Sequence, residues 1–202
     1  MKTTRLVPLL FILFCSPLFA AESVILFLGD SLTAGYGVRR EESYPERLSI
    51  RLKAKAPNIK VINGAESGSL SSSLNSRLNF FLNRFKPKLI VIASGGNDAR
   101  QLTDIKEIEK NLAAAIDLGK KSGATVALAQ MQIFPNLGKE YADAFKKLYP
   151  RLARNHKIVL LPFPLTGVAG VAELNQSDGF HPNAKGHEKI SLFLQPYLEK
   201  LL

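Results

Sequence analysis

Five short apolar segments, separated by longer segments with helical periodicity, constrain the fold of this chain more than any other feature. They are residues 24–29, 60–63, 88–96, 124–130 and 157–163, and they are rich in Val, Ile and Leu. Their apolarity is continuous rather than alternating, which is typical of strands buried on both faces of a parallel sheet. We therefore predict a parallel sheet with both faces covered.

The intervening segments have the periodicity of amphipathic helices, because apolar residues recur there three or four positions apart. Strands and helices that alternate along a chain imply right-handed crossovers and helices on both faces of the sheet. We predict one three-layer α/β/α domain of flavodoxin-like type, with five parallel strands in the order 2-1-3-4-5. The helices are expected at residues 43–57, 103–123 and 139–156, and after Pro182.

The first twenty residues have the pattern of a secretory signal peptide. Lys2 and Arg5 precede an apolar run at residues 6–15, and Ala20 lies at a small-residue cleavage site. The apolar run is too short to span a membrane. We expect cleavage to leave a mature domain at residues 21–202, exported to the periplasm or, as the alternative, secreted.

Cleavage would also remove Cys15, the only cysteine, so the mature domain has no disulfide, thiol nucleophile or cysteine metal site. The net charge of +10 includes the two basic residues of the leader. The remaining basic residues are scattered, without a run of five like charges or interleaved aromatic residues, which argues against nucleic-acid binding. We expect a monomer without membrane insertion, and weak attraction to anionic membrane surfaces stays open.

Polar residues follow the predicted strands at the edge where ligands bind in open parallel sheets. Ser31 follows the first strand, Gly68 the second and Asn97 the third, and Asp178 and His181 lie beyond the fifth. A hydroxyl, a flexible backbone amide, a carboxamide, a carboxylate and an imidazole thus meet at one edge. This set is the inventory for acyl transfer: a nucleophile, oxyanion donors, a base and a group that orients the base.

Each of these residues also has an ordinary structural alternative. Ser31 suits a helix N-cap, Gly68 a turn, Asn97 an Asx-turn, and His181 a capping turn before a helix. Independent capping needs would not converge on one edge of the sheet, and this favours the functional interpretation. We expect Asp30 to hold the nucleophile turn through backbone hydrogen bonds.

The remaining polar residues near these positions are given structural roles. Asp98 is expected to cap the turn that follows it. His156 ends a helix at the opposite edge of the sheet, and we expect it to be solvated there. His187 is expected on the surface. No H-x-x-x-H or H-E-x-x-H pattern supports a metal site, and no G-x-S-x-G elbow supports an α/β-hydrolase.

Four sequence blocks resemble the signatures of the SGNH (GDSL) hydrolases: GDSLTAGYG, the block with Gly68, GGND and DGFHPN. They occur in the family's order and span residues 29–187. The segment 131–153 is further similar to an exported bacterial branch described as a multifunctional acyl-CoA thioesterase, lysophospholipase and arylesterase. The resemblance implies a serine esterase that hydrolyses carboxylic esters and thioesters through an acyl-enzyme, without a cofactor.

The resemblance also implies a role for each matching residue. Ser31 would be the nucleophile and His181 the base, with Asp178 as the partner of His181. The oxyanion donors would be the Ser31 amide, Gly68 and Asn97. Substrates would be small-molecule esters or thioesters, including lysophospholipids.

Apolar residues in two loops are candidates for an acyl groove, although they suit ordinary loop packing equally well. Two other functions stay open: a carbohydrate O-deacetylase of the cell envelope, and a non-catalytic lipid- or glycan-binding protein. The candidate groove residues are Ile133, Phe134 and Leu137 in one loop, and Leu165, Val168, Val171 and Leu174 in the other.

Overall fold

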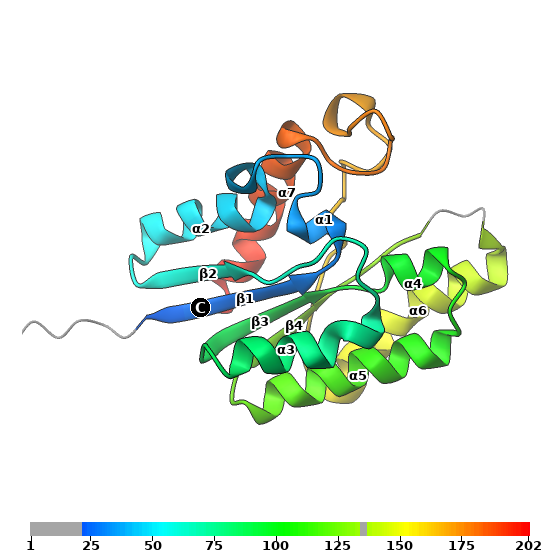
Figure 1. Cartoon of the computed structure of the whole chain (residues 1–202), viewed down its shortest axis with the longest axis horizontal. Coiled ribbons are helices and arrows are strands. Elements are labelled where there is room, and N and C mark those ends of the chain that lie inside the picture. Colours follow the sequence, from blue (N-terminus) through cyan, green and yellow to red (C-terminus); the bar gives the residue numbers. More distant parts are fainter. Residues whose placement is uncertain (1–21, 134–136) are drawn as a thin grey trace, which may run out of the picture.

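The computed structural model describes residues 22–133 and 137–202. Within them, five parallel strands form one sheet in the order β2-β1-β3-β4-β5, which confirms the predicted topology (Figure 1). The predicted leader, residues 1–20, and Phe134 lie outside the described residues. The strands are β1 (Ser23–Gly29), β2 (Ile59–Asn63), β3 (Pro87–Ala93), β4 (Thr125–Ala129) and β5 (Val159–Leu161).

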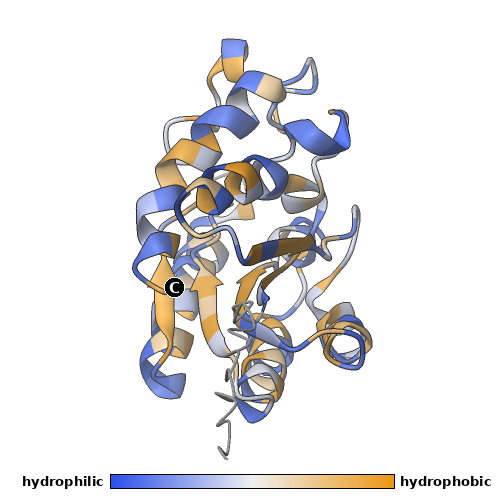
Figure 2. Ribbon diagram, turned by 90° about the vertical axis from the view of Figure 1, so that its left-hand side faces the viewer, coloured by the Kyte–Doolittle hydropathy of each residue, from blue (hydrophilic) through white to orange (hydrophobic). Residues whose placement is uncertain are grey.

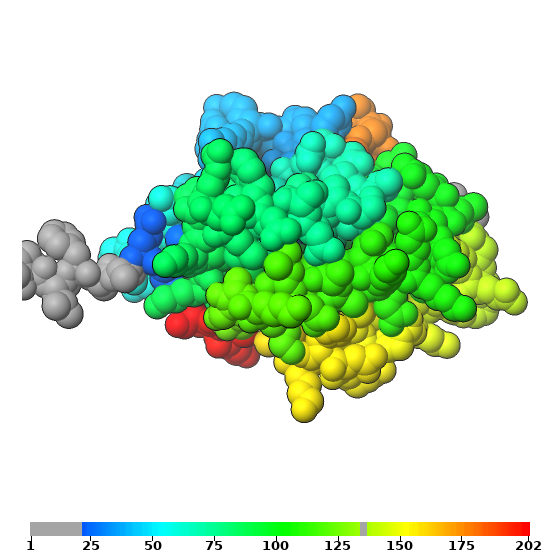
Figure 3. Space-filling view, turned by 60° about the horizontal axis from the view of Figure 1, so that its bottom comes forward, coloured from blue at the N-terminus to red at the C-terminus, as the bar shows by residue number. Residues whose placement is uncertain are grey.

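Helices cover both faces of this sheet, as predicted. The helices α2 (Tyr44–Lys55) and α7 (Ala184–Glu199) pack together on one face, and α3, α5 and α6 cover the other (Figure 1). Figure 3 shows the second layer from outside, where its helices close over the sheet. The remaining elements are α1 (Ser31–Ala34), α3 (Leu74–Leu82), α4 (Gly96–Arg100), α5 (Ile105–Lys121), α6 (Lys139–His156) and the 3-10 helices η1 (Arg40–Glu42), η2 (Ser71–Ser73) and η4 (Ala172–Leu174).

The core lies on both faces of the central strands, because β1 and β3 have neighbours on each side and helices above and below. Ile25, Leu26, Phe27 and Leu28 of β1 are at most 1% exposed. Figure 2 shows the strands as a hydrophobic layer between helices with hydrophilic outer faces. Continuous apolarity in the sequence therefore corresponds to burial on both faces.

Three strands are shorter than predicted. The strand expected at residues 124–130 is Thr125–Ala129, one residue shorter at each end. The strand expected at residues 88–96 ends at Ala93, because Gly95 adopts φ +112° and is the N-cap of α4. The strand expected at 157–163 pairs only at Val159–Leu161. Pro162 and Pro164 follow it, and proline has no N–H to donate to a neighbouring strand. Both polar loops therefore begin earlier than the apolar pattern suggests.

Within the described residues, no helix is both long and apolar enough to cross a membrane.

Candidate active site

The Ser31 hydroxyl lies at a tight turn between β1 and α1. A Cβ atom at Gly29 would lie 2.5 Å from Thr33 Oγ1 and 2.7 Å from the Ala93 carbonyl oxygen, so only glycine fits there. Asp30 is the N-cap of α1, and its Oδ1 accepts a hydrogen bond from the Leu32 N–H at 3.0 Å. Ser31 is the first residue of the helix and is 8% exposed. The strand and this cap together fix the serine at the edge of the sheet.

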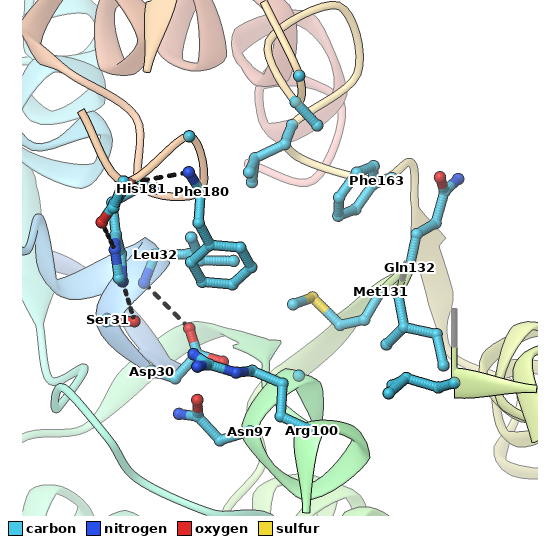
Figure 4. A pocket seen from close by; sticks show the side chains of 18 residues that line it. Asp30, Ser31, Leu32, Asn97, Arg100, Met131, Gln132, Phe163, Phe180 and His181 are labelled. Carbon is cyan, nitrogen blue, oxygen red and sulfur yellow. Dashed lines mark hydrogen bonds and ion pairs between the residues drawn. The ribbon is translucent and has the colours of Figure 1, made fainter. Parts of the chain in front are cut away.

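His181 connects Ser31 to Asp178, and these two residues are 147 positions apart in the sequence. The His181 Nε2 atom is 2.9 Å from Ser31 Oγ, and its Nδ1 atom is 2.6 Å from Asp178 Oδ2 (Figure 4). Asp178 Oδ1 also accepts hydrogen bonds from the backbone N–H groups of Phe180 and His181, each at 2.9 Å. The structure thus brings together the three predicted triad side chains in a continuous hydrogen-bonded series.

The hydrogen bonds to Asp178 keep its carboxylate charged. The bond with the His181 side chain, followed by the two backbone N–H bonds, lowers the pKa of Asp178 to about 2. The ionised carboxylate accepts a hydrogen bond from the N–H at His181 Nδ1, which leaves Nε2 without a proton to face the serine hydroxyl. This tautomer is the one that a general base requires.

Amide side chains hold the loop that contains His181. Asn175 donates to the carbonyls of Val168 and Val171, each at 2.7 Å. Gln176 donates to the carbonyls of Tyr36, at 2.7 Å, and Pro182, at 3.0 Å, while its backbone N–H donates to the His181 carbonyl. These bonds fix the loop together with the packing of Leu174 and Phe180 against the core.

Aromatic rings confine the imidazole of His181. The Tyr36 ring lies 4.7 Å from it, and the Phe180 ring meets it edge-on at 4.8 Å. The Arg100 guanidinium lies 5.3 Å from the centre of the Phe180 ring. Within the described residues, Arg100 forms no ion pair with a carboxylate.

The candidate oxyanion donors lie on two adjoining loops. Asn97 is half-buried at the start of α4, and its Nδ2 donates to the Ser69 carbonyl at 3.1 Å. Because Nδ2 has two hydrogens, one is left for a ligand. Gly68 lies in an exposed turn with φ +79°, and no atom would lie within 4 Å of a Cβ there. The structure does not place Gly68 among the residues that line the pocket beside Ser31.

The structure confirms the predicted role of Asp30 but not that of Asp98. Asp30 holds the nucleophile turn as expected, and its burial raises the pKa of its carboxyl group to about 6. Asp98 does not cap the following turn, and that prediction is wrong. It is buried and accepts hydrogen bonds from the Ser71 N–H at 2.9 Å and the Ser71 hydroxyl at 2.5 Å. Asp98 therefore joins α4 to the loop that contains Gly68.

The other two histidines are also not equivalent. His156 ends α6, and its Nδ1 lies 2.9 Å from Asp117 Oδ1. The prediction that His187 lies on the surface is wrong, because it is fully buried. The Tyr44 N–H donates to His187 Nδ1 at 3.3 Å, and burial lowers the pKa of His187 to about 4. A helix position alone does not reveal that α7 turns this residue inward.

A pocket of about 590 Å³ opens beside Ser31 and His181 (Figure 4). Leu137 and Leu165 line it as predicted, together with Ile133. Val168, Val171 and Leu174 do not line it: Val168 is fully buried in the core, Val171 is exposed, and Leu174 packs against the core. The other lining residues are Asp30, Leu32, Gly96, Asn97, Arg100, Met131, Gln132, Phe163, Ala169, Gly170, Asp178, Gly179 and Phe180.

The described residues contain no group of three or more His, Cys, Asp or Glu side chains that could hold a metal ion.

Sequence reasoning missed two arginines near the site. Arg77 follows Leu74 by three positions and precedes Leu78 by one. This helical spacing could have predicted that Arg77 lies on the apolar face of α3. Arg100 had no such signal, because its proximity to Phe180 depends on how α4 and the distant loop that contains His181 fold together.

The comparisons with known proteins agree with this geometry. The model of the GDSL-like Lipase/Acylhydrolase family matches residues 27–189. The chain is 36% identical to an arylesterase of Vibrio mimicus over 198 residues, covering 98% of this chain and 99% of the relative. It is 34% identical to the esterase TesA of Pseudomonas aeruginosa over 183 residues, covering 91% of each chain.

Solved structures give the same result. The crystal structure of TesA superposes with a TM-score of 0.85 at 33% identity, covering 89% of this chain and 100% of the other. The psychrotrophic esterase EstA from Pseudoalteromonas sp., inhibited by monoethylphosphonate, gives a TM-score of 0.85 at 30% identity, covering 89% and 98%. The chain belongs to the GDSL-like lipase/acylhydrolase (SGNH) family and is a hydrolase of ester bonds.

Proposed function

We propose that this protein hydrolyses carboxylic esters and thioesters through an acyl-enzyme on Ser31. The observation that supports this most directly is the contact between Ser31 Oγ and His181 Nε2 at 2.9 Å, with Asp178 on the far nitrogen of the imidazole. A serine hydroxyl is a weak nucleophile, and an adjacent base oriented by a third group activates it.

The reaction proceeds in two acyl-transfer steps. His181 Nε2 removes the Ser31 proton as Oγ attacks the substrate carbonyl, and Asp178 stabilises the resulting imidazolium. The N–H groups of Ser31 and Gly68 and the Asn97 carboxamide donate hydrogen bonds to the oxyanion. His181 then protonates the leaving alcohol or thiol, and the acyl group remains on Ser31. Water, deprotonated by His181, attacks the carbonyl carbon of the acyl-enzyme; the bond to Ser31 Oγ then breaks, His181 returns the proton to Oγ, and the acid is released.

The residues that line the pocket support a substrate class for this proposal. Its apolar wall suits an acyl chain, while Arg100 at the same pocket offers a positive charge. This combination fits esters and thioesters that have an anionic group, such as acyl-CoA and lysophospholipids. An enzyme named thioesterase 1/protease 1/lysophospholipase L1 from Escherichia coli is 30% identical over 195 residues, covering 96% of this chain and 92% of the relative. Neutral aryl esters would use the acyl wall alone.

The protein would act outside the cytoplasm. The leader at residues 1–20 supports export, with the periplasm as the expected location and secretion as the alternative. Mass spectrometry of the exported protein tests this, because cleavage after Ala20 predicts a chain that begins at Ala21. An intact N-terminus on the exported protein would contradict it.

Hydrolysis of p-nitrophenyl esters tests the reaction. We expect Ser31→Ala to lower kcat by about 10⁴-fold or more, because the oxyanion donors alone give only residual catalysis. The exposed Ser72, replaced by Ala, is the matched control and should retain activity. Turnover by Ser31→Ala at the rate of Ser72→Ala would exclude the proposed mechanism.

A series of acyl chains from C2 to C16 then separates the substrate classes. An acyl pocket of this size predicts a preference for chains longer than acetyl. A strict preference for C2 would favour an O-deacetylase of cell-envelope carbohydrates instead.

A further inference from the structure

Arg77 places a guanidinium beneath the loop that contains Gly68. It lies on α3 between the buried Leu74 and Leu78, and its side chain is only 12% exposed. Burial lowers the pKa of Arg77, and the carboxylates of Glu66 and Asp30 oppose this shift. A cation buried on the apolar face of a helix costs stability unless its donors are satisfied, so its contacts need an explanation.

The contacts of Arg77 all lead to segments that build the active site. Nη2 donates to the Gly29 carbonyl at 3.1 Å and to the Gly64 carbonyl, and Nη1 donates to Ser69 Oγ at 2.9 Å. Nε lies 3.5 Å from Glu66 Oε2. Gly29 ends β1 two residues before the nucleophile. One side chain therefore joins the nucleophile strand to residues 64–71, the segment we call the Gly68 loop.

The Gly68 loop depends on such bonds for its position. The Glu66 N–H and the Ser69 hydroxyl both donate to the Gly29 carbonyl at 3.1 Å. Gly68 itself is exposed, and a Cβ atom at this position would face open space. Arg77 holds the loop from below, and the bonds of α4 to Ser69 and Ser71 hold it from the other side.

We propose that Arg77 is the positioning residue of the oxyanion hole. Through Ser69 and the carbonyls of Gly29 and Gly64, it ties the Gly68 loop to the end of the strand that precedes Ser31 and so sets where the Gly68 N–H lies relative to the serine. The Asn97 carboxamide donates a hydrogen bond to the Ser69 carbonyl, and Arg77 donates one to the Ser69 hydroxyl. Arg77 therefore also influences the orientation of the Asn97 donor. This inference rests on the proposed function, because it presumes an oxyanion that forms at Ser31.

Kinetics of Arg77→Met and Arg77→Lys test the proposal. We expect Arg77→Met to lower kcat for p-nitrophenyl butyrate by about 30- to 100-fold, less than the about 10²- to 10³-fold for direct loss of an oxyanion donor because Arg77 acts through the loop, with KM changed less than about threefold. Arg77→Lys should recover part of kcat, because an ammonium can reach some of the same acceptors but not all. Combining Arg77→Met with Asn97→Ala should cost clearly less than the product of the single losses, because both changes disable the same oxyanion hole.

Arg151→Met is the matched control. Arg151 donates two hydrogen bonds to Glu109, each at 2.7 Å, between α6 and α5, where it contacts no active-site residue. This variant should lower Tm while kcat stays at the wild-type value. If kcat of Arg77→Met falls no further than that of Arg151→Met, or if its loss multiplies fully with that of Asn97→Ala, Arg77 is only a structural residue.

Chemical rescue of Arg77→Ala by a guanidinium compound is a second test, which does not depend on the methionine side chain of Arg77→Met. A surface hollow of about 500 Å³ is lined by Gly64, Glu66, Arg77 and Phe80. Guanidinium ions can therefore enter the space left by Arg77→Ala. We expect millimolar methylguanidinium to raise kcat of this variant several-fold and to leave Arg151→Ala unchanged. The proposal would be overturned if methylguanidinium gave no rescue and kcat of Arg77→Lys were no higher than that of Arg77→Met. An active Ser31→Ala would instead remove the proposed function itself.

Discussion

The two sides of the active site are built in opposite ways. Ser31 follows a strand whose residues are almost completely buried, and its turn is fixed by the core and by Gly29. His181 and Asp178 lie on an outer loop, in which Asp178 is exposed and hydrogen bonds from the Asn175 and Gln176 side chains add to the packing of Leu174 and Phe180. The comparison teaches that the buried sheet fixes the nucleophile, whereas the base also depends on hydrogen bonds from amide side chains.

The two aspartates make the same contrast in electrostatics. Each accepts a hydrogen bond from the N–H two residues further along the chain, Asp30 from Leu32 and Asp178 from Phe180. Burial raises the pKa of Asp30 to about 6, whereas hydrogen bonds to His181 lower the pKa of the exposed Asp178 to about 2. The carboxylate that must stay charged during catalysis is the one that water reaches.

Replacing Asp178 gives the largest effect on the exposed side. We expect Asp178→Asn to lower kcat by about 10²- to 10⁴-fold, because the amide would favour the wrong tautomer of His181. The Tm should change little, since Asp178 is exposed. Steady-state kinetics and thermal unfolding measure both quantities. A variant with normal kcat, or one that loses activity only through unfolding, would break the comparison.

Removing Asn97 tests the donor on the buried side. We expect Asn97→Ala to lower kcat by about 100-fold or more, because each oxyanion donor contributes about 3–4 kcal/mol to the transition state. Asn79→Ala, at an exposed position on α3, is the control and should behave as wild type. A rise in KM with unchanged kcat would assign Asn97 to substrate binding instead.

The sequence predicted the buried side of the molecule better than the loops. Continuous apolar runs predict strands such as β1, because burial on both faces leaves few alternatives. The strand order was inferred from the flavodoxin-like fold class and not from the runs themselves. The ends of β3 and β5 were misjudged, since a φ of +112° at Gly95 and the pairing of residues beside Pro162 depend on neighbouring segments.

The same limit applies to single side chains. The three predicted triad residues lie together, because strand ends meet at one edge of the sheet. The buried position of His187 and the bond from Ser71 to Asp98 could not be read, because each depends on a contact between distant segments. Val168 was misplaced for the same reason, since only the folded loop shows that it faces the core.

The pH dependence of stability sharpens the contrast between buried and exposed groups. The pKa of His187 is lowered from 6.5 to about 4, so the unfolded chain binds its proton first as the pH falls. The free energy of unfolding should therefore fall between about pH 6.5 and pH 4, by up to about 3 kcal/mol from this residue. The raised pKa of Asp30 acts in the opposite direction, because its folded carboxyl group takes up a proton before the unfolded one.

Urea unfolding of wild type and His187→Gln across this pH range distinguishes the contribution of His187 to the pH dependence from that of Asp30. Removal of His187 should flatten the loss of stability at acid pH or reverse its sign. If the slope of the free energy of unfolding against pH is unchanged in His187→Gln, the pKa of His187 is the same in the folded and unfolded states.

Arg100 gives the smallest expected effect. We expect Arg100→Gln to lower kcat/KM for an acyl-CoA by about three- to tenfold, consistent with loss of about 1 kcal/mol from one exposed charge contact. The p-nitrophenyl ester of the same acyl chain should be unaffected, and added salt should reduce the difference between the two substrates. An equal loss for both substrates would mean that Arg100 acts by shaping the pocket through Phe180.

Covalent labelling by a fluorophosphonate tests the central claim most directly, namely that a buried strand end and an exposed loop together activate one serine. Mass spectrometry of the digested protein should find the phosphonyl group on Ser31. The labelling rate should fall by about 100-fold or more in His181→Ala, and Ser31→Ala should remain unlabelled. A label on another residue, or labelling of Ser31 at an undiminished rate in His181→Ala, would contradict the account.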